Sequence, residues 1–245
     1  MGRAHEVRAA SMAKTAAAKS KLYGRYGKEI FIAAKSGVPD PDMNLALRAK
    51  IKEAKSNQVP ADVIKRAIDR AKGGDSANYD ELRYEGFGPG NSTVIVDCLT
   101  DNSNRAYTEV RNAFNKSKGA KIAGAGAVSF GYQRLGVFCF ESDMSEDDMF
   151  ELLLGEEVEV TDIACDEGYF EIKVDPSAFS KAQEVLEANI EGVEFDKCEI
   201  GMVADEMVTL SSAEDIAAYN KLMGLLEEAD DVNKVYTNVI IEEAE

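Results

Sequence analysis

The sequence predicts an α+β protein, with a helical N-terminal domain followed by two ferredoxin-like α+β domains, one inserted into the other. Three observations support this. The first third is rich in alanine and places its apolar residues at helical spacing. After Tyr79 the apolar pattern changes to a period of two, which is typical of strands. From there two series of strands and helices follow, and the second interrupts the first. We expect domains at 1–78, at 79–134 with 204–245, and at 135–203.

The N-terminal third predicts several helices. Residues 4–37 contain no proline and place their apolar residues on one face. A short stretch with two prolines then restarts the chain, and we expect Asp40 to cap the next helix with Pro41 at its first position. Further helices are expected over 43–57 and 61–72, and the second of these is stopped by a pair of glycines.

A glycine-rich loop, EGFGPGNS, follows at 85–92. A phosphate-binding P-loop requires a lysine and then Ser or Thr after its last glycine, followed by a helix. Here Gly90 is followed by Asn91 and Ser92 and then by a strand pattern. The stretch therefore predicts a turn between two strands, and nucleotide hydrolysis on this loop is excluded.

The rest of the chain alternates between the two periods. The outer series has strands at 82–87, 92–100, 206–210 and 232–240, and helices within 100–119 and at 213–229. A further strand ending near 133 is expected after the glycine-rich segment that begins at Gly124. The inner series reads as a complete β-α-β-β-α-β unit, with strands at 136–141, 158–165, 168–174 and 194–203 and helices at 146–156 and 177–189.

The net charge of −17 is distributed unevenly. Residues 1–75 carry 16 lysines and arginines against 8 aspartates and glutamates, and residues 76–134 carry 7 against 6. Residues 135–245 carry 5 against 31. Such a division indicates a partner: the basic end suits an anionic polymer, and the acidic end faces away from it or meets a basic protein surface.

Enzymatic function is not supported by the sequence. The only histidine is His5, near the terminus, and no HExxH or GxSxG motif is present. Four acids at 143–148 can be drawn as a magnesium site, but acids at a helix N-terminus are the simpler interpretation. The four cysteines are more than 20 residues apart, so we expect buried thiols in a reducing cytosol and no CxxC site. No cofactor and no membrane segment are expected.

Two long segments resemble the YebC/PmpR family. They are RYEGFGPGNSTVIVDCLTDNSNRAYTEVRNAF and PDPDMNLALRAKIKEAKSNQVPADVIKRAIDRAKGG. The resemblance implies a three-domain cytoplasmic protein with a role in gene expression, because the family is described as DNA-binding transcriptional regulators and includes a mitochondrial translational activator. Many members open with a Ser-Lys-Trp element, whereas this chain has no tryptophan and opens Met-Gly-Arg-Ala. No catalytic residue carries over.

Two groups of basic residues are the candidate nucleic-acid contacts, because lysine and arginine bind phosphates without reading sequence. The first group is Arg3, Arg8, Lys14, Lys19, Lys21, Arg25, Lys28, Arg48 and Lys52. The second group is Arg105, Arg111, Lys116, Lys118 and Lys121. Tyr23 and Tyr26 lie between basic residues and can stack on unpaired bases, although packing inside the helical domain explains them better.

The sequence therefore predicts a non-enzymatic, nucleic-acid-binding regulator of gene expression, in first place a DNA-binding transcriptional regulator. One alternative is a translation factor associated with ribosomal RNA, since no base-reading element is recognisable. The other is a protein-binding adaptor that uses the acidic inserted domain. The oligomeric state is not readable from the sequence.

Overall fold

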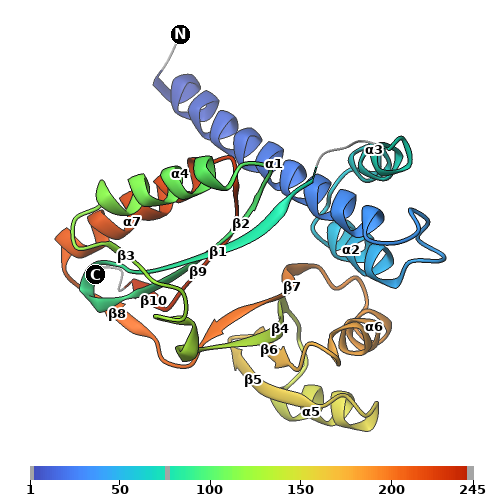
Figure 1. The fold of residues 1–245 in the computed structure, drawn as a ribbon. Coiled ribbons are helices and arrows are strands. Elements are labelled where there is room, and N and C mark those ends of the chain that lie inside the picture. Colours follow the sequence, from blue (N-terminus) through green and yellow to red (C-terminus); the bar gives the residue numbers. More distant parts are fainter. Residues whose placement is uncertain (1–2, 75–77, 242–245) are drawn as a thin grey trace. The chain divides into compact units, whose positions relative to one another are not determined.

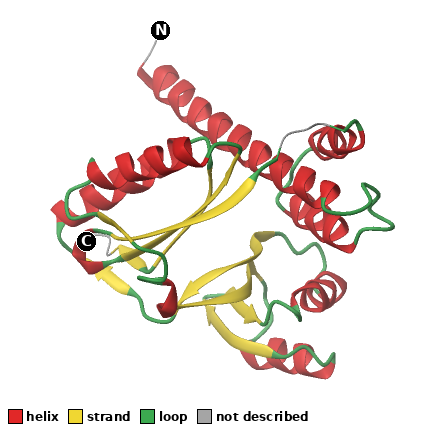
Figure 2. Cartoon of the chain, in the orientation of Figure 1, coloured by secondary structure: helices red, strands yellow, loops and turns green. Residues whose placement is uncertain are grey.

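The computed structural model describes residues 3–74 and 78–241, with side chains from residue 19 onward. The chain mixes helices and antiparallel sheets (Figure 2) and divides into two compact units. The first unit comprises residues 1–76 and 194–198, and the second comprises 77–193 and 199–245. The second unit holds one four-stranded sheet and all of the other except residues 195–198, which belong to the first unit, so the division into three domains stays a prediction. Within the described ranges, no helix combines the length and the apolar character needed to cross a membrane.

The helical unit is built around one long helix. The helix α1 (Arg3–Lys35) runs without interruption and packs against both α2 (Leu45–Ser56) and α3 (Ala61–Lys72). Its second half supplies most of the core, because its large apolar residues recur on one face. The fully buried residues of this core include Tyr26, Ile30, Phe31, Ala34, Leu47 and Ala54.

The cap of α2 differs from the prediction. Asn44, not Asp40, is the N-cap: its Oδ1 accepts the Leu47 N–H at 3.0 Å, and its Nδ2 donates to the carbonyl oxygens of Ala33 at 2.8 Å and Val38 at 3.0 Å. Asp40 instead accepts a backbone N–H within the preceding turn. An asparagine can both cap α2 and tie it to the end of α1, whereas a carboxylate has no donor for the second task.

The first sheet has the order β3-β1-β2-β9, and all its neighbouring strands are antiparallel. Its strands are β1 (Asp80–Phe87), β2 (Thr93–Thr100), β3 (Lys121–Ala123) and β9 (Val232–Thr237). The helices α4 (Ser103–Asn115) and α7 (Ala213–Glu228) cover one face of it (Figure 1). The core between helices and sheet is Val94, Val96, Cys98, Ala106, Val110, Ala113, Phe114, Leu222 and Leu226.

The chain order of this sheet departs from a simple β-α-β-β-α-β plan. In that plan, the strand that lies between β2 and β3 in the sheet would come after β3 along the chain. Here that place is taken by β1, which precedes β2 and joins it through the turn η1 (Pro89–Asn91). The glycine-rich loop is thus a turn between strands, as predicted, and Gly90 adopts a φ of 64° in it.

The second sheet confirms the predicted ferredoxin-like order. Its spatial order is β5-β6-β4-β7, with strands β4 (Tyr132–Glu141), β5 (Val160–Asp166), β6 (Tyr169–Val174) and β7 (Phe195–Ala204). The helices α5 (Glu146–Gly155) and α6 (Phe179–Asn189) complete the series. Stacked aromatic rings contribute to the core: the ring centroids of Phe138 and Phe179 lie 4.7 Å apart, and those of Phe140 and Phe170 lie 5.7 Å apart.

The last predicted strand is divided in two by a buried asparagine. Asn238 lies between β9 and β10 (Val239–Ile241), and β10 pairs in parallel with β8 (Val208–Leu210). Its Oδ1 accepts the Thr93 N–H at 2.8 Å, and its Nδ2 donates to the Glu206 carbonyl at 3.2 Å. The side chain therefore satisfies both strands at the point where the chain changes sheets.

Candidate nucleic-acid interface

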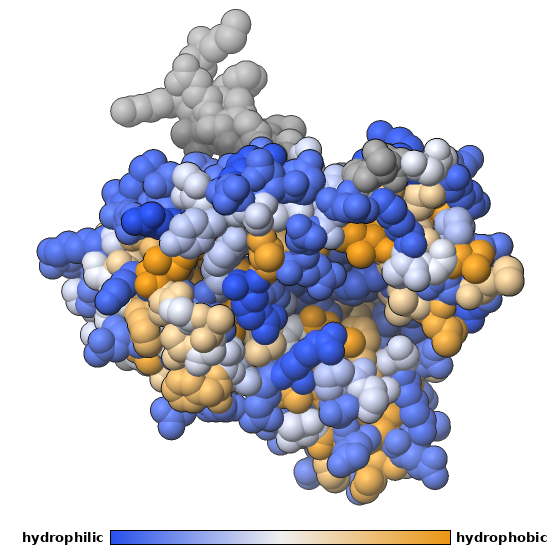
Figure 3. Space-filling view, in the orientation of Figure 1, coloured by the Kyte–Doolittle hydropathy of each residue, from blue (hydrophilic) through white to orange (hydrophobic). Residues whose placement is uncertain are grey.

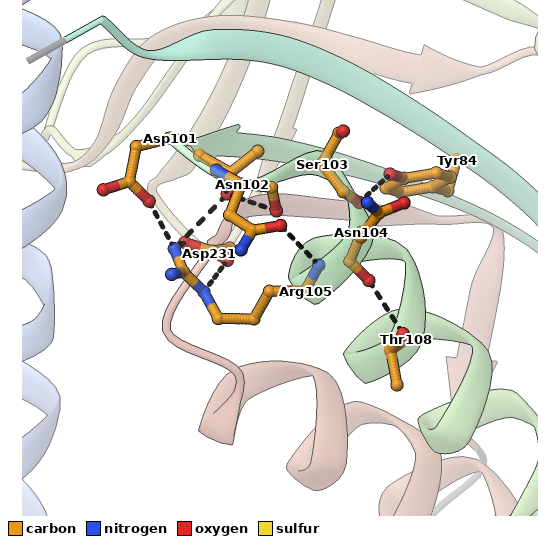
Figure 4. A network of polar contacts seen from close by, with 9 residues as sticks. Tyr84, Asp101, Asn102, Ser103, Asn104, Arg105, Thr108 and Asp231 are labelled. Atoms are coloured by element: carbon orange, nitrogen blue, oxygen red, sulfur yellow. Dashed lines mark hydrogen bonds and ion pairs between the residues drawn. The ribbon is translucent and has the colours of Figure 1, made fainter.

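Arg105 lies at the start of α4 within a network of polar contacts (Figure 4). Its Nε donates to Asp231 Oδ2 at 2.7 Å, and its Nη2 donates to Asp231 Oδ1 at 2.9 Å and to Asp101 Oδ1 at 2.6 Å. The Asp231 side chain is only 3% exposed. The hydrogen bonds to Asp231 and Asp101 raise the pKa of Arg105. Arg105 thus compensates a buried carboxylate, so its charge is already committed inside the protein.

The basic residues that follow Arg105 in the sequence have different surroundings from Arg105. The stretch 110–140 contains Arg111, Lys116, Lys118, Lys121 and Arg134 and no aspartate or glutamate. The side chains of Arg111, Lys116 and Lys121 are exposed, and no described carboxylate forms an ion pair with them. Lys116 is also the C-cap of α4, where the helix dipole favours a cation. Three of the five predicted cations are therefore exposed and form no ion pair with a described carboxylate.

Lys118 forms an ion pair with Glu214 at the start of α7. Both side chains are more than half exposed. An ion pair between two exposed side chains contributes little to stability, so little free energy is lost when it opens. Lys118 therefore differs from Arg111, Lys116 and Lys121, because its charge is available only when its ion pair with Glu214 opens.

The helical unit carries the other predicted cations. Arg3, Arg8 and Lys14 belong to α1, but their side chains lie outside the described part of the chain. Lys19 is exposed, and Lys21, Arg25 and Lys28 are partly buried along the same helix.

The cations of α2 take part in local contacts. Arg48 is exposed, but its Nε and Nη2 donate to the carbonyls of Pro41 at 3.0 Å and Asp42 at 2.8 Å, closing the turn before α2. Lys52 is partly buried on the same helix. Lys50 bridges two buried glutamates, Glu29 at 3.0 Å and Glu53 at 2.7 Å.

The two tyrosines proposed for stacking differ in exposure. Tyr26 is completely buried, and its hydroxyl donates to Glu53 Oε1 at 3.4 Å. Burial, and then the charge of Glu53, raises the pKa of Tyr26. Its ring is part of the core and has no free face for a base, while Tyr23 is partly buried.

Comparison with known proteins decides the family. Residues 3–74 match the domain described as "TACO1/YebC protein N-terminal domain", and residues 79–239 match "TACO1/YebC second and third domain". The chain belongs to the TACO1/YebC family. This confirms the resemblance found in the sequence.

Members of the TACO1/YebC family from distant bacteria are similar along their whole length. A "probable transcriptional regulatory protein" of Pseudoalteromonas atlantica is 46% identical over 242 residues, covering 99% of this chain and 98% of that protein. A protein of the same name from Acholeplasma laidlawii is 46% identical over 240 residues, covering 98% of each chain. The crystal structure of a conserved hypothetical protein from Aquifex aeolicus superposes with a TM-score of 0.76 at 32% identity, covering 92% of this chain and 91% of that one.

Other candidate sites of this TACO1/YebC protein have structural explanations. The acids at 143–148 surround the start of α5, where Ser145 caps the helix by accepting the Asp148 N–H at 3.1 Å. Within the described ranges, no three His, Cys, Asp or Glu side chains are grouped to hold a metal. Among the four cysteines, Cys98, Cys139 and Cys198 are buried, and Cys165 is partly exposed.

Sequence reasoning missed one residue that organises the cationic stretch. Glu85, in the middle of β1, is only 4% exposed and accepts three backbone N–H groups from the glycine-rich segment after β3. Nothing in the sequence around Glu85 indicated that its carboxylate would accept backbone N–H groups from a distant segment. The absence of acids over 110–140 was the available clue to the surface itself.

The pH dependence of stability should report the Glu85 contacts. Burial alone would raise the pKa of Glu85, but hydrogen bonds from Val128, Gly126 and Ser129 outweigh it and hold the pKa below its usual value. The ionised group therefore stabilises the fold above its unfolded pKa of about 4.3, and this contribution is lost as the pH falls through the lower folded value. We expect Glu85→Gln to lower the free energy of unfolding at pH 7.

The measurement is urea denaturation of both proteins at neutral and acidic pH. The difference between wild type and Glu85→Gln should be largest at neutral pH and should shrink in acid, below about pH 4. A difference that stays constant down to the acid limit would show that the carboxylate charge contributes nothing to this fold.

Proposed function

We propose that this TACO1/YebC protein is a non-enzymatic regulator of gene expression that binds nucleic acid through the cations of α1 and of the segment 111–121. The observation that carries the proposal is the acid-free stretch 110–140, with Arg111, Lys116 and Lys121 exposed. Exposed cations that no described carboxylate pairs create a positive local potential, although the whole chain has a net charge of −17. Relatives named as probable transcriptional regulatory proteins support a regulator. In first place we propose DNA as the target.

Ribosomal RNA is the second candidate target. The exposed cations suit phosphates, which both A-form and B-form helices present. In the described residues they lie at the C-terminal end of α4 and on a short strand, an arrangement that offers phosphate contacts without base readout. A target recognised by backbone shape therefore fits this surface as well as a promoter does.

A protein-binding role of the acidic inserted domain is favoured by one observation. The outer face of α5 exposes Phe150 (44%) and Leu154 (61%), one helical turn apart, among aspartates and glutamates. An apolar pair surrounded by acids suits a basic protein segment. This role is compatible with nucleic-acid binding elsewhere on the chain.

The test is affinity capture of the tagged protein from lysate, with and without nuclease, followed by sequencing of the bound nucleic acid. Recovery of specific DNA fragments supports transcriptional regulation, whereas recovery of ribosomal RNA would replace DNA with the ribosome as target. If no nucleic acid is recovered and the captured proteins resist nuclease, the nucleic-acid proposal is wrong and the adaptor remains.

A further inference from the structure

Phe130 is the most exposed large apolar side chain among the described residues, at 84%. It lies in the short 3-10 turn η2 (Ser129–Gly131), which leads directly into β4. Single exposed apolar residues are common on protein surfaces, and Figure 3 shows several hydrophobic areas among hydrophilic ones on one face. Exposure alone therefore does not make Phe130 functional, and the structure around it has to be considered.

The backbone before Phe130 is held by hydrogen bonds to the buried Glu85 side chain. Glu85 Oε1 accepts the Gly126 N–H at 2.9 Å, and Oε2 accepts the N–H groups of Val128 at 2.8 Å and Ser129 at 3.0 Å. Gly126 has a φ of 82°, a conformation that other residues rarely adopt. A single buried carboxylate thus holds the segment that leads up to Phe130.

The chain is also fixed on the other side of Phe130. Tyr132 is 8% exposed, packs with Ile95 and Val128, and shares a hydrogen bond of 2.8 Å with the Thr93 hydroxyl. Phe130 is therefore an exposed aromatic side chain between two anchored neighbours. Such pre-organisation reduces the entropy lost when a partner binds.

The surrounding chemistry suits a nucleic acid. Lys121 and Arg134 flank this turn in the sequence, both are exposed, and no acid occurs between them. Besides the buried Glu85, an acid from the segment after β7 reaches the turn: the Asp205 N–H donates to the Gly131 carbonyl at 2.9 Å, and its carboxylate accepts the Gln133 side-chain amide at 2.6 Å. The Gln133 amide is neutral, so Asp205 keeps its negative charge, but among the described residues it forms no ion pair with Lys121 or Arg134.

We propose that Phe130 stacks on an unpaired base of a bound nucleic acid, and that Glu85 is the positioning residue that presents it. This rests on the proposed nucleic-acid binding and adds the class of ligand, a single strand or an unpaired loop. Every base offers a π-face, so an aromatic ring beside backbone-binding cations binds single strands without sequence preference. Stacking was the less favoured of two sequence interpretations of Tyr23 and Tyr26, and the ring of Tyr26 is buried in the core.

The experiment compares wild type with Phe130→Ala by fluorescence anisotropy, on a short single strand and on a blunt duplex of the same sequence. Losing one stacked base should weaken single-strand binding by about tenfold, while duplex binding changes less than about twofold. A single strand carrying 2-aminopurine gives a direct signature, because stacking on Phe130 quenches its fluorescence. The quenching should disappear in Phe130→Ala and return in Phe130→Tyr, but not in Phe130→Leu.

A matched control is Phe150→Ala, which truncates another exposed phenylalanine, on the acidic α5, and should leave both affinities unchanged. Glu85→Gln should reduce the quenching while the cations remain, since one of the two acceptor oxygens becomes a donor. Circular dichroism melting separates this effect from unfolding.

The outcomes distinguish the two proposals. If wild type binds neither probe at low salt, the proposed nucleic-acid function itself fails. If wild type binds both probes but Phe130→Ala binds the single strand as tightly and quenches as strongly as wild type, the stacking role of Phe130 is wrong and the nucleic-acid function stands.

Discussion

Reversing two cations at the C-terminal end of α4, in the double variant Arg111→Glu with Lys116→Glu, is expected to weaken nucleic-acid binding by about tenfold to a hundredfold near physiological salt. Each phosphate contact on duplex DNA releases condensed counterions and contributes about −0.9 to the slope of log K against log salt. Losing two contacts should therefore reduce the magnitude of that slope by about 1.8. Anisotropy titrations at several salt concentrations measure both quantities.

The matched control for this prediction is Lys181→Glu with Lys221→Glu. These two lysines are also exposed on helices, α6 and α7, and their reversal changes the net charge by the same amount. If the affinity reflects overall charge alone, both double variants lose it equally. If the surface at 111–116 makes the contacts, the control keeps the wild-type slope. Equal losses would therefore contradict a defined interface.

Truncating Phe114 to alanine is expected to lower the free energy of unfolding by about 3–5 kcal/mol. The side chain is fully buried between α4 and the first sheet. Its ring also occupies the space above Gly86 in β1: a Cβ built on Gly86 would lie 2.4 Å from the ring Cε1 and 2.7 Å from the Lys121 carbonyl oxygen. The cavity left by the ring has no other side chain on the Gly86 side to fill it.

Urea denaturation measures this effect, and Phe130→Ala is the control, because the same truncation at an 84% exposed position removes little packing. A second variant tests the contact itself. Gly86→Ala should lower the free energy of unfolding of wild type by about 1–3 kcal/mol. In the Phe114→Ala background the same substitution should lower it by a smaller amount, because the ring is gone but the Lys121 carbonyl remains close. Strict additivity of the two changes would show that Phe114 and Gly86 do not interact.

The contrast between Arg105 and Arg111 shows how structure sorts cations that look equivalent in sequence. Arg105 binds Asp231 bidentately and connects α4 with the segment before β9, so its loss would leave a buried carboxylate without its partner. Arg111, six residues further along the same helix, is exposed and forms no ion pair with a described carboxylate. A variant intended to test nucleic-acid binding should therefore avoid Arg105.

The sequence by itself determined the elements and the charge. The period of apolar residues placed α4, α7 and three of the four strands of the inner series close to their observed positions, because helix and strand spacing depend on near neighbours along the chain. The fourth, β4, begins at Tyr132, four residues before the predicted strand at 136–141. The basic and acidic segments, and the rejection of a P-loop at 85–92, also followed from local composition.

Only the tertiary structure decided which distant groups meet. Asp231 reaches Arg105 across 126 positions of the chain, and Glu85 reaches Val128 across 43. The position of β1 between β2 and β3 brings Glu85 under the turn that carries Phe130. Local spacing specifies each helix or strand, but the partner of a buried charge depends on which strands become neighbours. That is settled by packing of the whole sheet, so the anchored turn was not visible in the sequence.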